Sequence, residues 1–175
     1  MALAFRADRT IALVGLMAAG KTTVGARLAA RLGLPFADSD AAVEQAAGLS
    51  VADLFERMGE AAFRERERHA IAELANGPPC VLAAGGGAFS DAPTRQLMLQ
   101  RCTVVWLDAD VQTLAGRLAQ DRKRPLLRGR DPLPALAELA RQREADYAQA
   151  PLRVSAELPV EAIVEQIATL LAARS

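Results

Sequence analysis

The sequence predicts an α/β protein in which helices cover both faces of a parallel β-sheet. Two observations support this fold class. Short apolar runs alternate along the 175 residues with segments of helical periodicity, and the runs are continuous rather than interrupted by polar residues, as is typical of strands buried on both faces. Ligands of such sheets bind at the carboxyl ends of the strands. The residues that follow each predicted strand are therefore candidates for a functional site.

The first strand, at 11–14, leads into 15–23, whose sequence GLMAAGKTT matches the phosphate-binding pattern G-x-x-x-x-G-K-S/T. A helical pattern follows and ends at Gly33, so the motif stands between a strand and a helix, as it requires. Backbone N–H groups of such a loop, together with the helix dipole, bind phosphate oxygens. In this arrangement Lys21 reaches the β- and γ-phosphates, and the Thr22 hydroxyl binds Mg²⁺. The residues expected to bind the nucleotide here are Ala18, Ala19, Gly20, Lys21, Thr22 and Thr23.

The composition argues against several classes of function. The chain is 51% hydrophobic and 24% charged, and its 21 basic and 21 acidic residues leave no net charge. We therefore expect no nucleic-acid surface, and the lack of a membrane-spanning run or signal peptide predicts a cytoplasmic protein with no membrane partner. Cys80 and Cys102 are expected to be buried thiols. His69, the single histidine, is expected to be solvated, so neither a zinc site nor a serine–histidine triad is expected.

A pair of acids follows the second predicted strand, a short extended stretch at 34–37. In Asp38-Ser39-Asp40, alternate residues after a strand can direct both carboxylates into one crevice. Asp38 could then hold a water of Mg²⁺, and Asp40 could accept the proton of a substrate hydroxyl. N-capping of the next helix is the alternative, but capping needs only one of the two acids. The pair therefore favours a functional role.

Three helical patterns follow, over 41–47, 50–58 and 60–75, with Gly48 and Gly59 as breaks. The third contains Arg64, with Glu60 one turn before it and Glu67 almost one turn after it. Such neighbours are usual for solvated surface pairs, which contribute little to stability. The alternative is a guanidinium fixed for the capture of a carboxylate. From these residues alone, the surface interpretation is favoured.

Three glycines, Gly85-Gly86-Gly87, follow a third strand predicted at 80–84. A tight turn needs one or two glycines, and three in a row cost backbone entropy unless something approaches the main chain closely. The run therefore favours a ligand contact. A helix then begins at Asp91, and a fourth strand at 103–107 leads into a helix over 111–119.

The segment 121–132 is rich in arginine, lysine and proline, and it has no periodic apolar face, so it predicts a mobile loop. In a phosphate-binding protein, a cation on such a loop could neutralise charge during phosphoryl transfer. Arg124 is the first candidate because it adjoins the stiff sequence Pro125-Leu126-Leu127, and Arg117 is the second. The chain ends with a helix over 133–148, a strand at 152–155 and an amphipathic helix that Pro159 opens at its first position.

Together these motifs resemble the shikimate kinase family. The motifs that carry the resemblance, over nearly the whole chain and in the family's order, are the 15–23 loop, Asp38-Ser39-Asp40, the FRERE sequence at 63–67, Gly85-Gly86-Gly87 and Arg124-Pro125-Leu126-Leu127. The resemblance implies the fold of nucleoside-monophosphate kinases, a three-layer α/β/α sandwich with a five-stranded parallel sheet of order 2-3-1-4-5. It also implies a single domain over 1–175, with the P-loop at about 15–23, a helical substrate-binding segment at about 38–75 and a mobile lid at about 120–132.

The implied reaction is the ATP-dependent phosphorylation of the 3-hydroxyl of shikimate, on the route to chorismate and the aromatic amino acids. The implied cofactor is Mg²⁺, ATP and shikimate are the partners, and the protein is expected to be a monomer. By the same resemblance Asp40 contacts the substrate hydroxyls, Asp38 lies near Mg²⁺, and Arg64 binds the substrate carboxylate with Glu67 orienting it. This role of Arg64 reverses the surface interpretation. The implied catalytic residues are Lys21, Asp40 and Arg124.

The remaining implied contacts divide between the two substrates. Those to shikimate come from Asp40, Arg64, Gly85, Gly86, Gly87 and Arg143, with Gly86 contributing its backbone and Arg143 binding the carboxylate a second time. Those to ATP come from the P-loop and Arg124, and Arg117, the second candidate from the residues themselves, is also expected to bind the nucleotide. The stretch 154–159 departs from the family by being shorter and lacking an arginine, so no adenine contact is assigned.

Three alternatives compete with this function. A gluconate kinase of the same fold also uses ATP and a polyol acid, but Arg64 with the glycine run favours shikimate. A GTP switch would need an Asn-Lys-x-Asp motif, and the only asparagine, Asn76, precedes Gly77. A non-catalytic relative that binds shikimate as an effector would normally need an output domain, and we expect no second domain in 175 residues.

Overall fold

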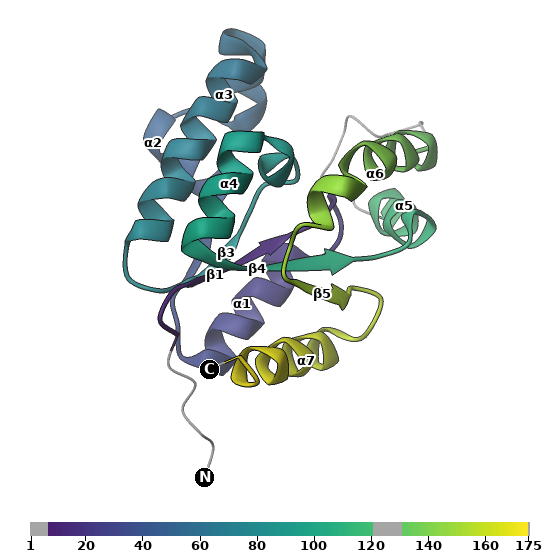
Figure 1. Cartoon of the computed structure of the whole chain (residues 1–175). Coiled ribbons are helices and arrows are strands. Elements are labelled where there is room, and N and C mark those ends of the chain that lie inside the picture. Colours follow the sequence, from purple (N-terminus) through teal and green to yellow (C-terminus); the bar gives the residue numbers. More distant parts are fainter. Residues whose placement is uncertain (1–6, 121–130, 175) are drawn as a thin grey trace.

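The computed structural model describes residues 7–120 and 131–174. In these ranges the chain forms a parallel sheet with helices around it (Figure 1). The elements, in chain order, are β1 Thr10–Val14, α1 Lys21–Leu32, β2 Phe36–Asp38, α2 Ser39–Ala47, α3 Val51–Asn76, β3 Val81–Ala83, the 3₁₀ turn η1 Ala88–Ser90, α4 Ala92–Arg101, β4 Cys102–Asp108, α5 Val111–Gln120, α6 Leu133–Tyr147, β5 Leu152–Ser155 and α7 Val160–Ala172.

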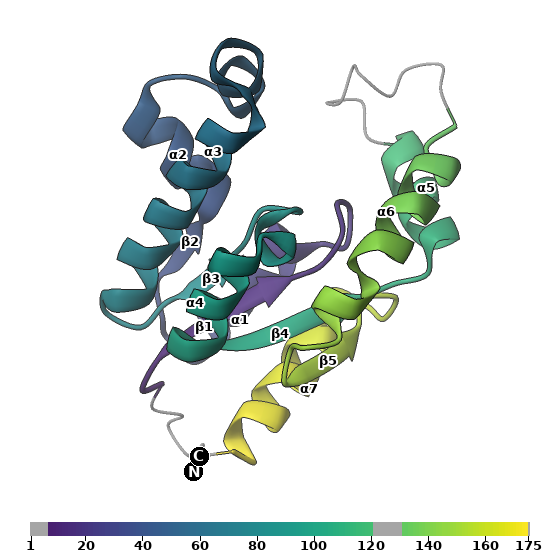
Figure 2. The same ribbon diagram turned by 45° about the horizontal axis from the view of Figure 1, so that its top comes forward.

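The sheet has five strands in the order β2-β3-β1-β4-β5, and all neighbours are parallel, as predicted. β1 is the central strand, and each of its residues is buried because helices cover both faces. α1 and α7 pack together on one face, while α4 packs against β4 on the other (Figure 1). Figure 2 shows α2 and α3 at one side of the sheet and α5 and α6 at the opposite side. The P-loop after β1 therefore lies between two groups of helices.

Local sequence signals account for most helix ends. Gly33 and Gly48 close α1 and α2 in the left-handed conformation, with φ of 68° at both, as predicted for helix C-caps. The predicted break at Gly59 is also present, since its φ of 80° and ψ of 173° are not helical. The two flanking helical segments nevertheless form one element, α3, with a kink. Some boundaries were predicted wrongly: Pro159 is the N-cap of α7 rather than its first residue, α2 begins at Ser39 rather than at 41, and β2 spans Phe36–Asp38 rather than 34–37.

The hydrophobic core lies between the sheet and the helices that cover it. α7 buries Ile163, Val164, Ile167 and Leu171 there, which confirms most of its predicted apolar face. Cys80 and Cys102 are buried free thiols, and His69 is exposed beside Glu73, as predicted. Within the described ranges, no helix is long and apolar enough to cross a bilayer.

Candidate active site

A cleft of about 790 Å³ opens at the carboxyl ends of β1, β2 and β3. Its walls come from the P-loop, the start of α2, one side of α3, the glycine run after β3, and Arg143 of α6. Most of the candidate site residues therefore meet in one place, where an α/β sheet is expected to bind its ligands. Those that line the cleft are Ala18, Gly20, Lys21, Thr22, Thr23, Asp38, Asp40, Arg64, Gly85, Gly86, Gly87 and Arg143.

The P-loop has the curled backbone that phosphate binding requires. Gly15 and Gly20 have φ of 151° and 92°, and Ala18, with φ of 65°, is the one non-glycine residue in the described ranges with a positive φ. At Gly15 a side chain is excluded, since an added Cβ would lie 2.6 Å from the carbonyl oxygen of Leu107. Lys21 Nζ donates hydrogen bonds of 2.7 Å and 2.9 Å to the carbonyls of Gly15 and Leu16. The ammonium group is thus held across the loop.

Asp38 combines the two roles that its sequence context left as alternatives. Its Oδ1 accepts hydrogen bonds from the N–H groups of Asp40 and Ala41 and so caps α2. Its Oδ2 lies 3.3 Å from the Thr22 hydroxyl, at the first turn of α1. A hydroxyl beside a carboxylate offers the hard oxygen donors that Mg²⁺ prefers, and Mg²⁺ usually takes only one or two protein ligands besides water and phosphate. Thr22 and Asp38 therefore fit a magnesium site that also needs the nucleotide.

Asp40 is not used for capping and lies beside the main chain of Gly85. An added Cβ at Gly85 would lie 2.7 Å from Asp40 Oδ1 and 2.8 Å from Glu67 Oε2. Burial, and then the charge of Asp38, raises the pKa of Asp40, against the opposing charges of Lys21 and Arg64. A buried carboxylate with a raised pKa is a stronger base than an exposed one, as general-base catalysis requires.

Arg64 is fixed by a buried carboxylate rather than by surface pairs. Its Nη1 donates a 2.6 Å hydrogen bond to Glu67 Oε1, and the side chain of Glu67 is only 1% exposed. Glu60, which is exposed, lies farther away, with its Oε1 3.7 Å from Nε. Burial raises the pKa of Glu67, and Arg64 opposes that rise. The surface interpretation of Arg64 from its neighbours alone is wrong, and the ion pair holds the guanidinium at the cleft.

Neighbouring side chains of the protein itself leave no room for a Cβ at two positions of the glycine run. At Gly87 an added Cβ would lie 2.8 Å from Cζ of Arg64 and nearer still to Nη2, while Gly85 is bounded by Asp40 and Glu67. Two of the three glycines are thus needed by the site residues themselves, before any ligand is considered. The N–H of Gly85 also donates to the buried Ser39 hydroxyl at 2.9 Å, so this group is already occupied.

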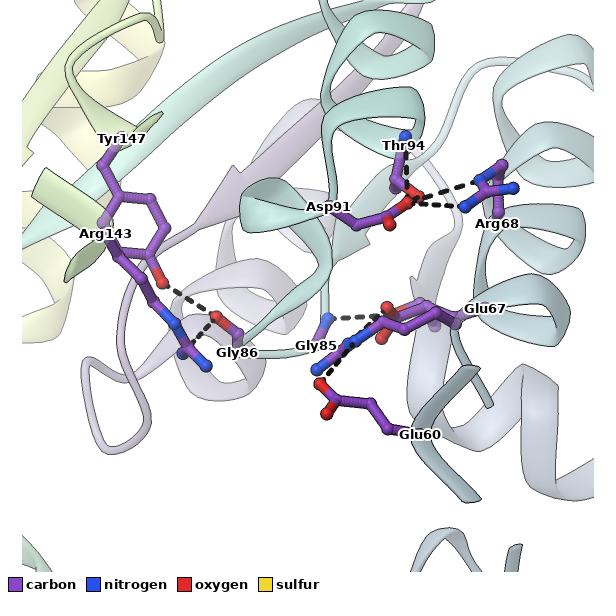
Figure 3. Close-up of polar contacts among 11 residues, drawn as sticks. Glu60, Glu67, Arg68, Gly85, Gly86, Asp91, Thr94, Arg143 and Tyr147 are labelled. Atoms are coloured by element: carbon purple, nitrogen blue, oxygen red, sulfur yellow. Dashed lines mark hydrogen bonds and ion pairs between the residues drawn. The ribbon is translucent and has the colours of Figure 1, made fainter. Parts of the chain in front are cut away.

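Arg143 and Tyr147 both donate to the Gly86 carbonyl, each at 2.8 Å (Figure 3). Arg143 therefore faces the glycine run and lines the same cleft as Arg64, which lies on α3. Tyr147 is 2% exposed, and its ring stacks on those of Phe89 and Trp106. Burial raises the pKa of Tyr147, so its hydroxyl remains a donor at neutral pH.

Two of the candidate residues in the described ranges, Ala19 and Arg117, do not line the cleft. Ala19 is buried, and its N–H donates to the Leu16 carbonyl within the P-loop. Arg117 lies on α5 and bridges the P-loop to the turn after β5, donating to the carbonyls of Ala18 at 3.1 Å and Ala156 at 2.7 Å. Arg124 lies outside the described residues, as does most of the predicted lid at about 120–132.

Four residues of the site were not assigned a role from the sequence. Ser39 stands between the two acids, and this position beside them is the signal that could have identified it. Tyr147 lies one helical turn after Arg143, which is the spacing that places it on the same face. Val51 and Phe55 share the apolar face of the helix predicted over 50–58, and in the structure they line the cleft, with Phe55 37% exposed.

Comparison with known proteins gives concordant results. Residues 17–172 match the family model described as shikimate kinase. A shikimate kinase of Caulobacter vibrioides (strain NA1000 / CB15N) is 51% identical over 164 residues, covering 93% of this chain and 82% of that protein. One from Zymomonas mobilis subsp. mobilis is 49% identical, covering 91% of each. The solved structure of a shikimate kinase from Acinetobacter baumannii, in complex with shikimate, superposes with a TM-score of 0.90 at 37% identity, covering 98% of this chain and 97% of that one.

Proposed function

Because the chain belongs to the shikimate kinase family, we propose that its cleft transfers the γ-phosphoryl group of ATP to the 3-hydroxyl of shikimate. The family is one of kinases that use ATP with Mg²⁺. The observation that carries the assignment of the acceptor is Arg64, held by the buried Glu67 at the same cleft as the P-loop. A guanidinium fixed by a buried partner is suited to bind a carboxylate, which shikimate has.

The nucleotide side of the cleft is formed by the P-loop and the N-terminus of α1. In the proposed arrangement the loop N–H groups and Lys21 bind the phosphates, so Lys21 leaves the carbonyls of Gly15 and Leu16 for the incoming oxygens. Thr22 and Asp38, the latter through water, would hold Mg²⁺, which would supply positive charge beside the phosphates. Ala18, Ala19, Gly20 and Thr23 complete the loop around the nucleotide.

The acceptor side is formed by α3, the glycine run and α6. Arg64 and Arg143 approach the cleft from different elements, so together they can bind one carboxylate and orient the ring that bears it. Asp40, which lines the same cleft, orients the attacking hydroxyl and takes its proton. The protein does little covalent work, because phosphoryl transfer depends chiefly on positioning and on charge stabilisation.

Further parts of the proposal rest on the resemblance to the family. Arg124 is assigned to ATP, with Arg117 added as the second candidate from the residues themselves, and the segment at about 120–132 is assigned as a lid. Gly85, Gly86 and Gly87 are assigned to the floor of the shikimate site, with Gly86 contributing a backbone contact. We also propose that residues 1–175 form one domain that acts as a monomer in the cytoplasm.

The test is a coupled assay of ADP release with shikimate, with gluconate and without an acceptor. We expect turnover that depends on shikimate and not on gluconate. Arg64→Ala should raise KM for shikimate by about 10- to 100-fold, as for a lost charged hydrogen bond, and leave KM for ATP nearly unchanged. Arg68→Ala is the matched control, since Arg68 lies one turn farther along α3 and pairs with Asp91 instead of lining the cleft. ADP release that is independent of shikimate would refute the proposal.

A further inference from the structure

We infer that Tyr147 is a positioning residue for the acceptor: its hydroxyl holds the Gly86 carbonyl so that Arg143 can leave that carbonyl for the substrate carboxylate. The inference rests on the proposed function, because it takes Arg143 as a carboxylate ligand. It goes further by assigning a role in substrate binding to a residue that lies behind the glycine run and outside the lining of the cleft.

The Gly86 carbonyl has two donors that come from one helix. Tyr147 Oη and Arg143 Nη1 both lie 2.8 Å from Gly86 O (Figure 3). The two residues are four apart in α6 and so lie on the same face of it. A carbonyl oxygen has two lone pairs, so both donors are accommodated at once. One donor can therefore leave while the oxygen keeps a hydrogen bond to the other.

The two donors differ in their freedom to move. Tyr147 is 2% exposed, and its ring is stacked between Trp106 and Phe89 at centroid distances of 5.6 Å and 6.4 Å. Arg143 is only half-buried and lines the cleft at the end of a long side chain. The tyrosine is thus the fixed donor and the arginine the movable one. An arriving carboxylate competes with the Gly86 carbonyl for Arg143 and gains a charge-assisted hydrogen bond.

The tyrosine also fixes the orientation of the glycine run. The peptide between Gly86 and Gly87 is planar and trans, so its carbonyl and the N–H of Gly87 point in opposite directions. Holding the carbonyl toward α6 turns the N–H of Gly87 away from α6. Glycine peptides rotate easily, and without Tyr147 the peptide would be held by Arg143 alone. Binding of the carboxylate would then leave the Gly86 carbonyl with no donor, and this is the cost that Tyr147 removes.

The experiment measures KM for shikimate and for ATP in Tyr147→Phe, which removes the hydroxyl but keeps the ring. We expect KM for shikimate to rise about fivefold, because the Gly86 carbonyl is left without either donor once Arg143 turns to the substrate, and KM for ATP to change by less than about twofold. In the Arg143→Ala background the same substitution should change KM for shikimate by less than about twofold, because no arginine remains to be released.

Trp106→Phe is the control for loosened packing. Trp106 stacks on Tyr147, but the hydrogen bond to the Gly86 carbonyl comes from Tyr147 and not from Trp106. The substitution should lower the melting temperature and leave KM for shikimate unchanged. The inference is overturned by an unchanged KM for shikimate in Tyr147→Phe, by an equal rise for both substrates, or by the same rise with and without Arg143. A wild-type protein that releases no ADP with shikimate would overturn the proposed function itself, and the inference with it.

Discussion

Gly87→Ala should damage the acceptor site without damaging the fold. The added methyl would lie 2.8 Å from Cζ of Arg64 and closer to Nη2, and real side chains almost never approach a Cβ within 3.0 Å. The φ of Gly87 is −101°, so alanine fits the backbone without strain. The crowded group is the end of a flexible side chain, so it moves at little cost in stability. The guanidinium must shift by several tenths of an ångström to about 1 Å, a scale of misplacement that costs about 10²-fold.

The assay is steady-state ADP release with each substrate varied in turn. We expect kcat/KM for shikimate to fall by about 10²-fold in Gly87→Ala, while KM for ATP changes by less than about twofold, because the P-loop lies on the other wall. In the Arg64→Ala background the methyl has nothing to displace, so Gly87→Ala should have little further effect. Gly116→Ala is the control, since no atom lies within 4 Å of its added Cβ, and it should leave both constants unchanged.

Two results would refute this reasoning. One is a Gly87→Ala protein with normal kcat/KM for shikimate, which would mean that the position of the guanidinium does not matter. The other is a loss of the same size when Arg64 is already alanine. In that case the methyl would act on the ligand or the backbone, and not through the arginine.

Two further predictions concern the acids of the site and its support. Asp40→Asn should lower kcat by at least about 10²-fold and abolish the acidic limb of the pH profile. Since burial and Asp38 raise the folded pKa of Asp40, this carboxyl destabilises the fold as the pH rises through that pKa. Asp40→Asn should therefore be more stable than wild type at neutral pH, and equally stable below the ordinary carboxyl pKa; thermal melts over pH test this. Asp91→Ala should lower the free energy of unfolding by about 1–2 kcal/mol in urea with both KM values unchanged, because Asp91 caps α4 and pairs with Arg68. Burial tends to raise the pKa of Asp91, but hydrogen bonds from Thr94 and Arg68 lower it overall. The stability that the Asp91 carboxylate contributes should therefore be lost as the pH falls through that lowered pKa.

The fold was largely predictable because its signals are local. Continuous apolar runs marked β1, β3 and β4, and glycines in the left-handed conformation closed α1 and α2. The order of the strands came from the resemblance to a family, since no residue pattern states which strands are neighbours. The errors were in boundaries, such as Pro159, and in the joining of two predicted helices into α3 across Gly59.

The candidate site was predictable where a motif implies its own geometry, as in the P-loop. It was not predictable where burial decides the chemistry. Arg64 between two glutamates gives the pattern of a surface helix, and only packing of Glu67 against the Gly85 main chain makes that ion pair buried. Likewise, Phe55 has helical apolar spacing, yet it is 37% exposed because it lines the cleft beside α3. These contacts join segments distant in the chain, so no local pattern reveals them.

The most direct test of the central claim is to identify the product by ³¹P NMR after incubation with ATP, Mg²⁺ and shikimate. We expect one phosphate monoester resonance, coupled to the proton at the 3-position of the ring, with one ADP formed for each ester. This outcome would follow from a carboxylate held by Arg64 and Arg143 while Asp40 presents a single hydroxyl to the nucleotide. Phosphate on another hydroxyl, a mixture of esters, or ADP with only inorganic phosphate would contradict the account.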